Sequence, residues 1–261
     1  MKKRALGCLV LALSLLICFG IAEVFLRVAS SRWLRVFDVE MWQYARQVKI
    51  ESTHPGVVEE HRPNAKAWLM GAEVRTDEHG YRRADDATEA LRRPDDRQVV
   101  ALGDSVTFAW GVAQGQTFPD QLERLLSGTC PAKGGRRTTV KNAGIGNCNA
   151  SMEVARYREL IRARRPEWLI LGYSYNDAEP DPVPSHNFLY WNSALLSLGS
   201  ARLARLGPYR DYKSYYLGLY EEGKPGWVAT QKAIRDLGQM LREDGIPGTV
   251  ILLPELHEPR N

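Results

Sequence analysis

The sequence has few cysteines and histidines, and it has no long run of charge of one sign. Its 261 residues include four cysteines and five histidines, and none of them forms a CxxC or HExxH motif, so we expect neither a metal nor a cofactor. The formal net charge of +4 is dispersed along the chain, which gives no reason to expect nucleic-acid binding. A content of 44% hydrophobic and 25% charged residues excludes collagen-like, low-complexity and wholly disordered chains.

The chain has one long hydrophobic run, at its N-terminus. Residues 5–22 carry no charge and follow three basic residues, 2–4. As a helix this run would span about 27 Å, close to the roughly 30 Å of a bilayer's hydrocarbon core. We expect residues 1–30 to be an uncleaved single-pass anchor, because the run resumes after Glu23. The alternative is a cleaved signal peptide with a site at Gly20-Ile21-Ala22. We expect export of the remaining chain to the periplasm, although basic residues flank the run on both sides.

Residues 31–96 are polar and weakly periodic, and we interpret them as a membrane-proximal lead-in. One hairpin is predicted there, where residues 68–70 and 74–76 flank Gly71. Further along the chain, Cys130 and Cys148 are the cysteines outside the hydrophobic run. They could pair in an oxidising compartment and would stay thiols in a reducing one.

Residues 97–261 alternate between short apolar runs and segments of helical periodicity. This alternation predicts an α/β domain with a parallel sheet and right-handed crossovers. The predicted strands are 98–102, 138–141, 168–171 and 249–253, and the predicted helices open at Thr117, at Asn149 or Ser151, and at Trp227.

Polar residues suited to acyl transfer follow the first three predicted strands. Ser105 follows the first, Gly146 and Asn147 follow the second, and Asn176 follows the third. Because the carboxyl ends of parallel strands meet at one edge of a sheet, we expect these residues to converge. A serine hydroxyl can attack an ester carbonyl, while backbone N–H groups and an asparagine amide can stabilise the oxyanion. Each residue alone could be a helix cap or a turn former, but their order at three successive strand ends predicts a site.

These segments resemble blocks I, II and III of the SGNH (GDSL) esterase and lipase superfamily, over residues 97–257. The first reads Gly103-Asp104-Ser105-Val106-Thr107 and is similar in particular to that of bacterial membrane-anchored members. The resemblance implies a flavodoxin-like three-layer α/β/α fold. It also implies that Ser105 is the nucleophile and that its amide, a block II amide and the Asn176 side chain form the oxyanion hole. Block II departs from the pattern, because the expected glycine falls nearest Asn147, with Gly146 one place earlier.

The family's fourth block, D-x-x-H, does not occur after residue 177. His257 is the late histidine, but Pro254 stands where its aspartate would be, so His257 is left as a candidate base on weak grounds. We therefore expect the chain to be a fragment that lacks the last strand and this block, which would leave 249–253 as an apolar edge.

An aromatic-rich insertion is expected at residues 178–225, including a helix over 193–206. It could form a lid, a carbohydrate-stacking wall, a membrane-dipping surface or a small subdomain. Together these features predict a serine esterase or lipase-type hydrolase, or an O-acyl transferase, acting on esters of an exported lipid or glycan. The alternatives are a catalytically impaired binding or assembly protein of the cell envelope and a nucleotide- or phosphate-binding protein. The loop after the first predicted strand has fewer glycines and hydroxyl groups than nucleotide or phosphate binding would require. The oligomeric state is not predicted.

Overall fold

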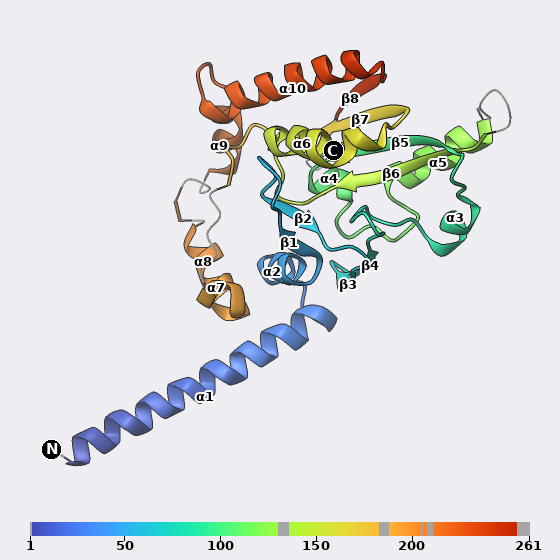
Figure 1. The fold of residues 1–261 in the computed structure, drawn as a ribbon. Helices are drawn as coiled ribbons and strands as arrows, with labels where there is room; N and C mark the ends of the chain where they lie inside the picture. The colour runs from blue at the N-terminus through green and yellow to red at the C-terminus, as the bar shows by residue number, and fades with distance from the viewer. Residues whose placement is uncertain (1, 130–135, 183–187, 205, 208–210, 255–261) are drawn as a thin grey trace, which may run out of the picture. The chain divides into compact units, whose positions relative to one another are not determined.

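The computed structural model describes residues 2–129, 136–182, 188–204, 206–207 and 211–254 (Figure 1). Its contacts divide into two compact units. The first unit combines Met1–Arg46 with Ser185–Arg210, and the second combines Gln47–Pro184 with Asp211–Asn261. The boundaries predicted at residues 30, 96, 178 and 225 rest on composition and hydrophobic patterning along the chain, and they stay predictions.

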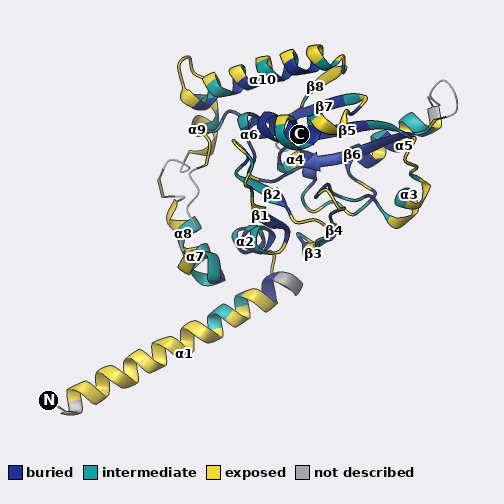
Figure 2. Ribbon diagram, viewed as in Figure 1, coloured by how far each residue is buried: buried dark blue, intermediate teal, exposed yellow. Residues whose placement is uncertain are grey.

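The first unit contains the hydrophobic N-terminal helix. Helix α1 spans Lys2–Arg32, and its segment Arg4–Ser30, with a mean hydropathy of 2.6, is long and apolar enough to cross a membrane. Figure 2 shows most of α1 exposed. A membrane anchor and a signal sequence both fit this description.

Two further helices of the first unit, α7 (Phe188–Asn192) and α8 (Ala194–Ala204), come from the predicted insertion. The Glu23 carboxylate of α1 accepts hydrogen bonds from the backbone N–H groups of Ala194 and Leu195, at 2.8 and 2.9 Å. It therefore caps the first turn of α8, satisfying amide groups that have no partner within the helix. The charge that interrupts the hydrophobic run thus has a fixed structural role.

The part of the lead-in that belongs to the second unit forms two small antiparallel pairs. Helix α2 (Phe37–Val48), which belongs to the first unit up to Arg46, leads into strand β1 (Lys49–Glu51), which pairs with β2 (Glu59–His61). The predicted hairpin is confirmed as β3 (Lys66–Leu69) and β4 (Ala72–Arg75). Its two turn residues, Met70 and Gly71, have φ of 52° and 79°; positive φ at both central positions is the mark of a type I′ turn. Helix α3 (Asp86–Leu91) then leads to the main sheet.

The main sheet has four parallel strands, as the apolar runs predicted. They are β5 (Arg97–Gly103), β6 (Thr138–Gly144), β7 (Trp168–Tyr173) and β8 (Gly248–Leu252), in the order β6-β5-β7-β8. Strand β8 lies at the edge of the sheet, where Val250 and Leu252 are 49% and 74% exposed.

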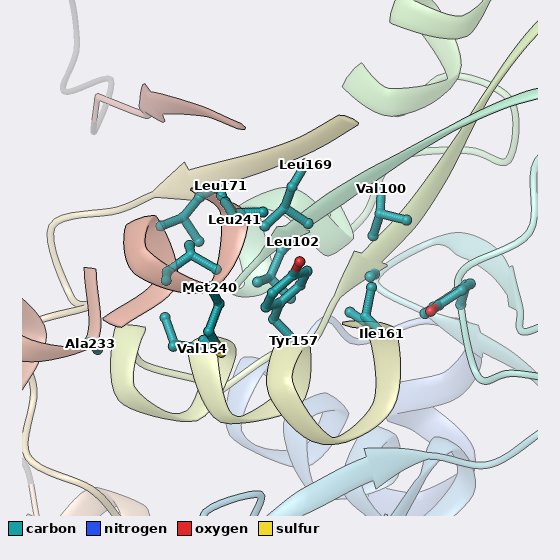
Figure 3. Close-up of a cluster of buried hydrophobic side chains, with 13 residues drawn as sticks. Val100, Leu102, Val154, Tyr157, Ile161, Leu169, Leu171, Ala233, Met240 and Leu241 are labelled. Carbon is teal, nitrogen blue, oxygen red and sulfur yellow. The ribbon is translucent and has the colours of Figure 1, made fainter. Parts of the chain in front are cut away.

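Helices cover both faces of this sheet, which confirms the predicted three-layer α/β/α fold. On one face α5 (Phe118–Thr129) packs through Leu122 and Leu126 on strand residues that include Val99 and Ile170. On the other, α6 (Ala150–Arg156) and α10 (Pro225–Asp244) pack on alternate residues of the same strands, such as Leu102. Figure 3 shows this second cluster. Strands buried on both faces are apolar at successive positions.

Side-chain caps begin two of these helices at the predicted places. Thr117 Oγ1 accepts from Asp120 N at 3.3 Å and Asn149 Oδ1 accepts from Met152 N at 3.0 Å, as N-cap side chains do. The helix predicted to open at Asn149 or Ser151 is wrong in one respect, because α6 is followed by a π-helical turn (Tyr157–Ile161) and a 3-10 turn (Arg162–Arg164). Apolar periodicity does not distinguish these turns from an α-helix.

Candidate active site

Three glycines at the carboxyl ends of neighbouring strands let a short helix lie directly on the sheet. Gly103 is in register with Gly144 on one side and Gly172 on the other. The short helix α4 (Ser105–Phe108) follows at once. A Cβ at Gly144 would come within 2.3 Å of Phe108 N, and a Cβ at Gly172 within 2.4 Å of Thr107 Oγ1. Glycine at the end of each of these three strands is visible in the sequence, and it indicates a close backbone contact at this edge of the sheet.

Ser105 is the first residue of α4, and Asp104 is its N-cap. Asp104 is fully buried, and its Oδ1 accepts a hydrogen bond from Val106 N at 2.9 Å. The Ser105 hydroxyl is half-buried and lies 3.5 Å from Asp104 Oδ2. Within the described part of the chain this hydroxyl forms no hydrogen bond with a histidine.

The block II turn has the backbone shape that glycine usually supplies. Asn147 has φ of 59°, in the left-handed region that asparagine tolerates better than most residues. Gly146 is buried and Asn147 is exposed. Ile145 N donates to Gly103 O at 3.0 Å, which ties this turn to the end of β5. Asparagine at position 147 can therefore adopt the same turn conformation as the glycine that the family pattern has there.

Ser174 connects the loop that carries Asn176 to the loop that carries Ser105. The Ser174 hydroxyl donates to Asp104 Oδ1 at 3.0 Å, and its backbone N–H donates to Asp177 Oδ2 at 2.5 Å. Asn176 lies between these anchors in the chain and is half-buried. The loops after β5 and β7 thus share one hydrogen-bonded network, which joins the surroundings of two of the predicted site residues.

Three carboxyl groups are fully buried beneath these loops: Asp104, Glu153 and Asp177. Burial, followed by the nearby Asp104 carboxyl, raises the pKa of Asp177 to about 8. Burial, then Asp177 and Asp104, raise the pKa of Glu153 well above its ordinary value. Neither carboxyl oxygen of Glu153 has a hydrogen-bond partner among the described residues. Burial and neighbouring carboxyl groups disfavour the charged form, so Asp177 and Glu153 favour their protonated forms at neutral pH.

Two buried side chains that the sequence analysis missed hold α4 in place. The Arg82 guanidinium donates to the carbonyl oxygens of Phe108 and Ala109, both at 2.5 Å, at the end of α4. The Asn142 side chain donates to Thr107 O at 2.9 Å. Arg82 comes from the lead-in, and no local pattern distinguishes it from the other arginines of that segment.

Part of the aromatic insertion lies beside the Asn176 loop. Helix α9 (Tyr212–Leu219) brings Tyr216 against Tyr175, with ring centroids 4.7 Å apart and planes at 84°. The Tyr175 and Tyr212 hydroxyls are hydrogen-bonded to each other. Because Tyr175 directly precedes Asn176, these tyrosines line the chain next to a predicted oxyanion donor.

The weak candidate base His257 and the cysteine Cys130 lie outside the described part of the chain. The base therefore stays a prediction, and whether Cys130 pairs with Cys148 stays open. Cys148 is a buried free thiol whose pKa burial raises. Of the described histidines, His61 is buried against Phe108, with ring centroids 4.9 Å apart, and burial lowers its pKa well below the ordinary value. The described residues contain no group of three or more potential metal ligands.

No protein-family profile matches this chain, and no curated protein matches it. Several solved structures do. One is a putative lipolytic protein of the G-D-S-L family from Desulfitobacterium hafniense DCB-2, with 14% identity over 60% of this chain and 77% of that chain and a TM-score of 0.28. AlinE4, an SGNH-hydrolase family esterase, has 17% identity over the same shares and a TM-score of 0.28. A catalytic mutant of Axe2, an acetylxylan esterase from Geobacillus stearothermophilus, has 16% identity over 58% and 74%, and a TM-score of 0.27. The first two of these proteins are described as members of the G-D-S-L and SGNH-hydrolase families.

Proposed function

We propose that this chain is a serine hydrolase of the SGNH type that acts on ester bonds, with Ser105 as its nucleophile. The observation that carries the proposal is the convergence of three loops at the ends of β5, β6 and β7. Gly103, Gly144 and Gly172 are in register, and neighbouring strands lie about 4.8 Å apart. The loops that follow are also hydrogen-bonded to one another.

In the proposed reaction, Ser105 Oγ attacks the ester carbonyl carbon and a general base takes the hydroxyl proton. The carbonyl oxygen becomes an oxyanion, which accepts hydrogen bonds from the Ser105 amide, the block II amide at Asn147 or Gly146, and Asn176 Nδ2. Collapse of this intermediate breaks the ester C–O bond, the leaving oxygen takes the proton from the base to give the alcohol, and an acyl-serine remains. Water then releases the acid, or an acceptor hydroxyl takes the acyl group. His257 is the candidate base.

The substrate class that we propose is an ester of an exported lipid or glycan. Two features support it. Helix α1 is apolar enough to hold the chain at a membrane, and the tyrosines around Tyr175 supply ring surfaces of the kind that stack on sugars or contact acyl chains. We place the second unit on the extracytoplasmic side. A C-terminal alkaline phosphatase fusion, active only after export, tests this orientation.

The proposed activity is tested by labelling the 261-residue protein in detergent micelles with a fluorophosphonate and by measuring hydrolysis of p-nitrophenyl esters. We expect labelling and weak turnover in the wild type, because no D-x-x-H block follows residue 177 and an unassisted serine hydroxyl is a poor nucleophile. We expect neither in Ser105→Ala. The matched control is Ser127→Ala, since Ser127 bonds to Thr138 O at the opposite end of β6. His257→Ala tests the candidate base. A properly folded wild type that neither reacts nor turns over would overturn the proposal and favour a binding or assembly protein.

A comparison of acyl acceptors separates hydrolysis from transfer. Soluble oligosaccharides are added to the ester assay, and the acylated sugar and the free acid are quantified by mass spectrometry. We expect free acid to dominate for a hydrolase. Acylated sugar in excess of free acid would assign the chain as an O-acyl transferase.

A further inference from the structure

A buried lysine from the lead-in holds the block II turn from below. The Lys49 side chain, on β1, is 2% exposed. Its Nζ donates to Gly146 O at 2.6 Å and to Glu59 Oε2 at 2.5 Å. The carboxylate balances the buried charge, and the bond from the ammonium to the carbonyl is of the strong, charge-assisted kind.

The contact with Gly146 O determines where the next amide points. The described residues contain no cis peptide bond, so the Gly146–Asn147 peptide is trans and planar, with its C=O and N–H directed oppositely. The carbonyl is directed at the buried ammonium. The Asn147 N–H is therefore directed away from the interior, on the side where Asn147 is exposed. A cation on the carbonyl oxygen also polarises the peptide, which makes its N–H a better donor.

We infer that Lys49 is a positioning residue for the oxyanion hole. It aims and polarises the Asn147 amide without touching the substrate. This inference rests on the proposed function, and it selects Asn147 over Gly146 as the block II donor. It also gives the lead-in a role in the reaction, because β1 carries the cation that orients a donor at the end of β6.

The test is a double variant, Lys49→Met with Glu59→Gln, which removes the cation without leaving the half-buried Glu59 carboxylate unpaired. The matched control is Arg92→Met with Glu123→Gln. That pair is also buried, with nitrogen and oxygen 2.7 Å apart, and it contacts Val140 within β6 rather than the block II turn. The full chain is assayed in micelles for kcat, KM, the rate of fluorophosphonate labelling and thermal unfolding.

Removal of an oxyanion donor costs about a hundredfold to a thousandfold in kcat, and a misdirected donor costs less. We therefore expect the Lys49 double variant to lose about tenfold to a hundredfold in kcat, with KM little changed and labelling slowed in parallel. The control should lose thermal stability but keep its kcat. Lys49→Arg retains a cation that can donate to Gly146 O, and its kcat should exceed that of the double variant.

A folded Lys49 double variant with wild-type kcat would overturn the inference, as would a rise in KM alone. If the double variant does not fold, kcat is measured for Lys49→Gln instead. A lower kcat supports the positioning role of Lys49, and an unchanged kcat refutes it. A wild type without reactivity overturns the proposed function itself, and this is seen before any Lys49 variant is compared.

Discussion

Replacement of Gly144 by alanine tests whether the contact between α4 and the sheet determines activity. The added Cβ would lie 2.3 Å from Phe108 N and 2.7 Å from Thr107 C. Both are backbone atoms, so no side chain can rotate away. Ordinary contact begins near 3.4 Å, so α4 or β6 must move by about 1.1 Å. Ser105 is on α4 and moves with it.

The expected cost follows from this displacement. Overpacking of a buried site typically lowers the free energy of unfolding by about 1–3 kcal/mol. A misplacement of about 1 Å in an active site can cost about a hundredfold in rate. We therefore expect Gly144→Ala to remain folded with a lower Tm and to lose about two orders of magnitude in kcat/KM for p-nitrophenyl acetate.

The control is Gly128→Ala in α5, where an added Cβ meets nothing within 4 Å. Alanine is favoured over glycine in a helix by about 0.5–1 kcal/mol, so this variant should be slightly more stable and fully active. Thermal unfolding, ester hydrolysis and phosphonate labelling are measured on both variants. Wild-type turnover in Gly144→Ala would refute the idea that close contact between α4 and β6 positions Ser105.

Three further predictions concern the loops. Asn176→Ala should lower kcat by about a hundredfold to a thousandfold with little change in KM; an effect on KM alone would contradict an oxyanion role. Asn147→Gly should keep its activity, because the proposed donor is backbone. Asn147→Val should lower the free energy of unfolding, measured by chemical denaturation, by about 1–2 kcal/mol, because φ of 59° strains a branched residue. Equal stability of Asn147→Val and Asn147→Gly would argue against this strain. Burial and Asp104 raise the pKa of Asp177 from 3.8 to about 8, so the folded state retains a proton that the unfolded chain releases. The free energy of unfolding therefore falls as pH rises from about 4 to about 8, and Asp177→Asn should flatten the corresponding fall in Tm.

The sheet and its helices could be predicted because their signals are local. The runs around Val99, Ile170 and Val250 mark strands, and Thr117 and Asn149 mark helix starts by capping chemistry. The hairpin at Met70 and Gly71 was found one or two residues away from its true position. The helix after Asn149 was predicted without its π-helical turn, because periodicity records which residues are buried and not how many residues each turn contains.

The site could be predicted only in outline. Ser105 and Asn176 follow strands whose adjacency is a general property of parallel α/β sheets, so their positions in the sequence were informative. The residues that hold the loops were missed. Arg82 and Lys49 lie in a polar segment whose charged residues are all expected, from the sequence, to be exposed to solvent. Ser174 looks like an ordinary loop serine in the sequence.

The amino-acid sequence alone predicts the hydrophobic N-terminal helix, the parallel sheet, and the order in which the candidate residues follow its strands. Each of these depends on neighbouring residues along the chain. Which charged side chains are buried, and what they contact, could be seen only in the folded chain. Lys49 meets Gly146, Arg82 meets Phe108, and Asp104 meets Ser174 across long distances in the sequence. Burial makes these contacts strong, because a buried charge must find a partner, and that partner is chosen by the fold rather than by the local sequence.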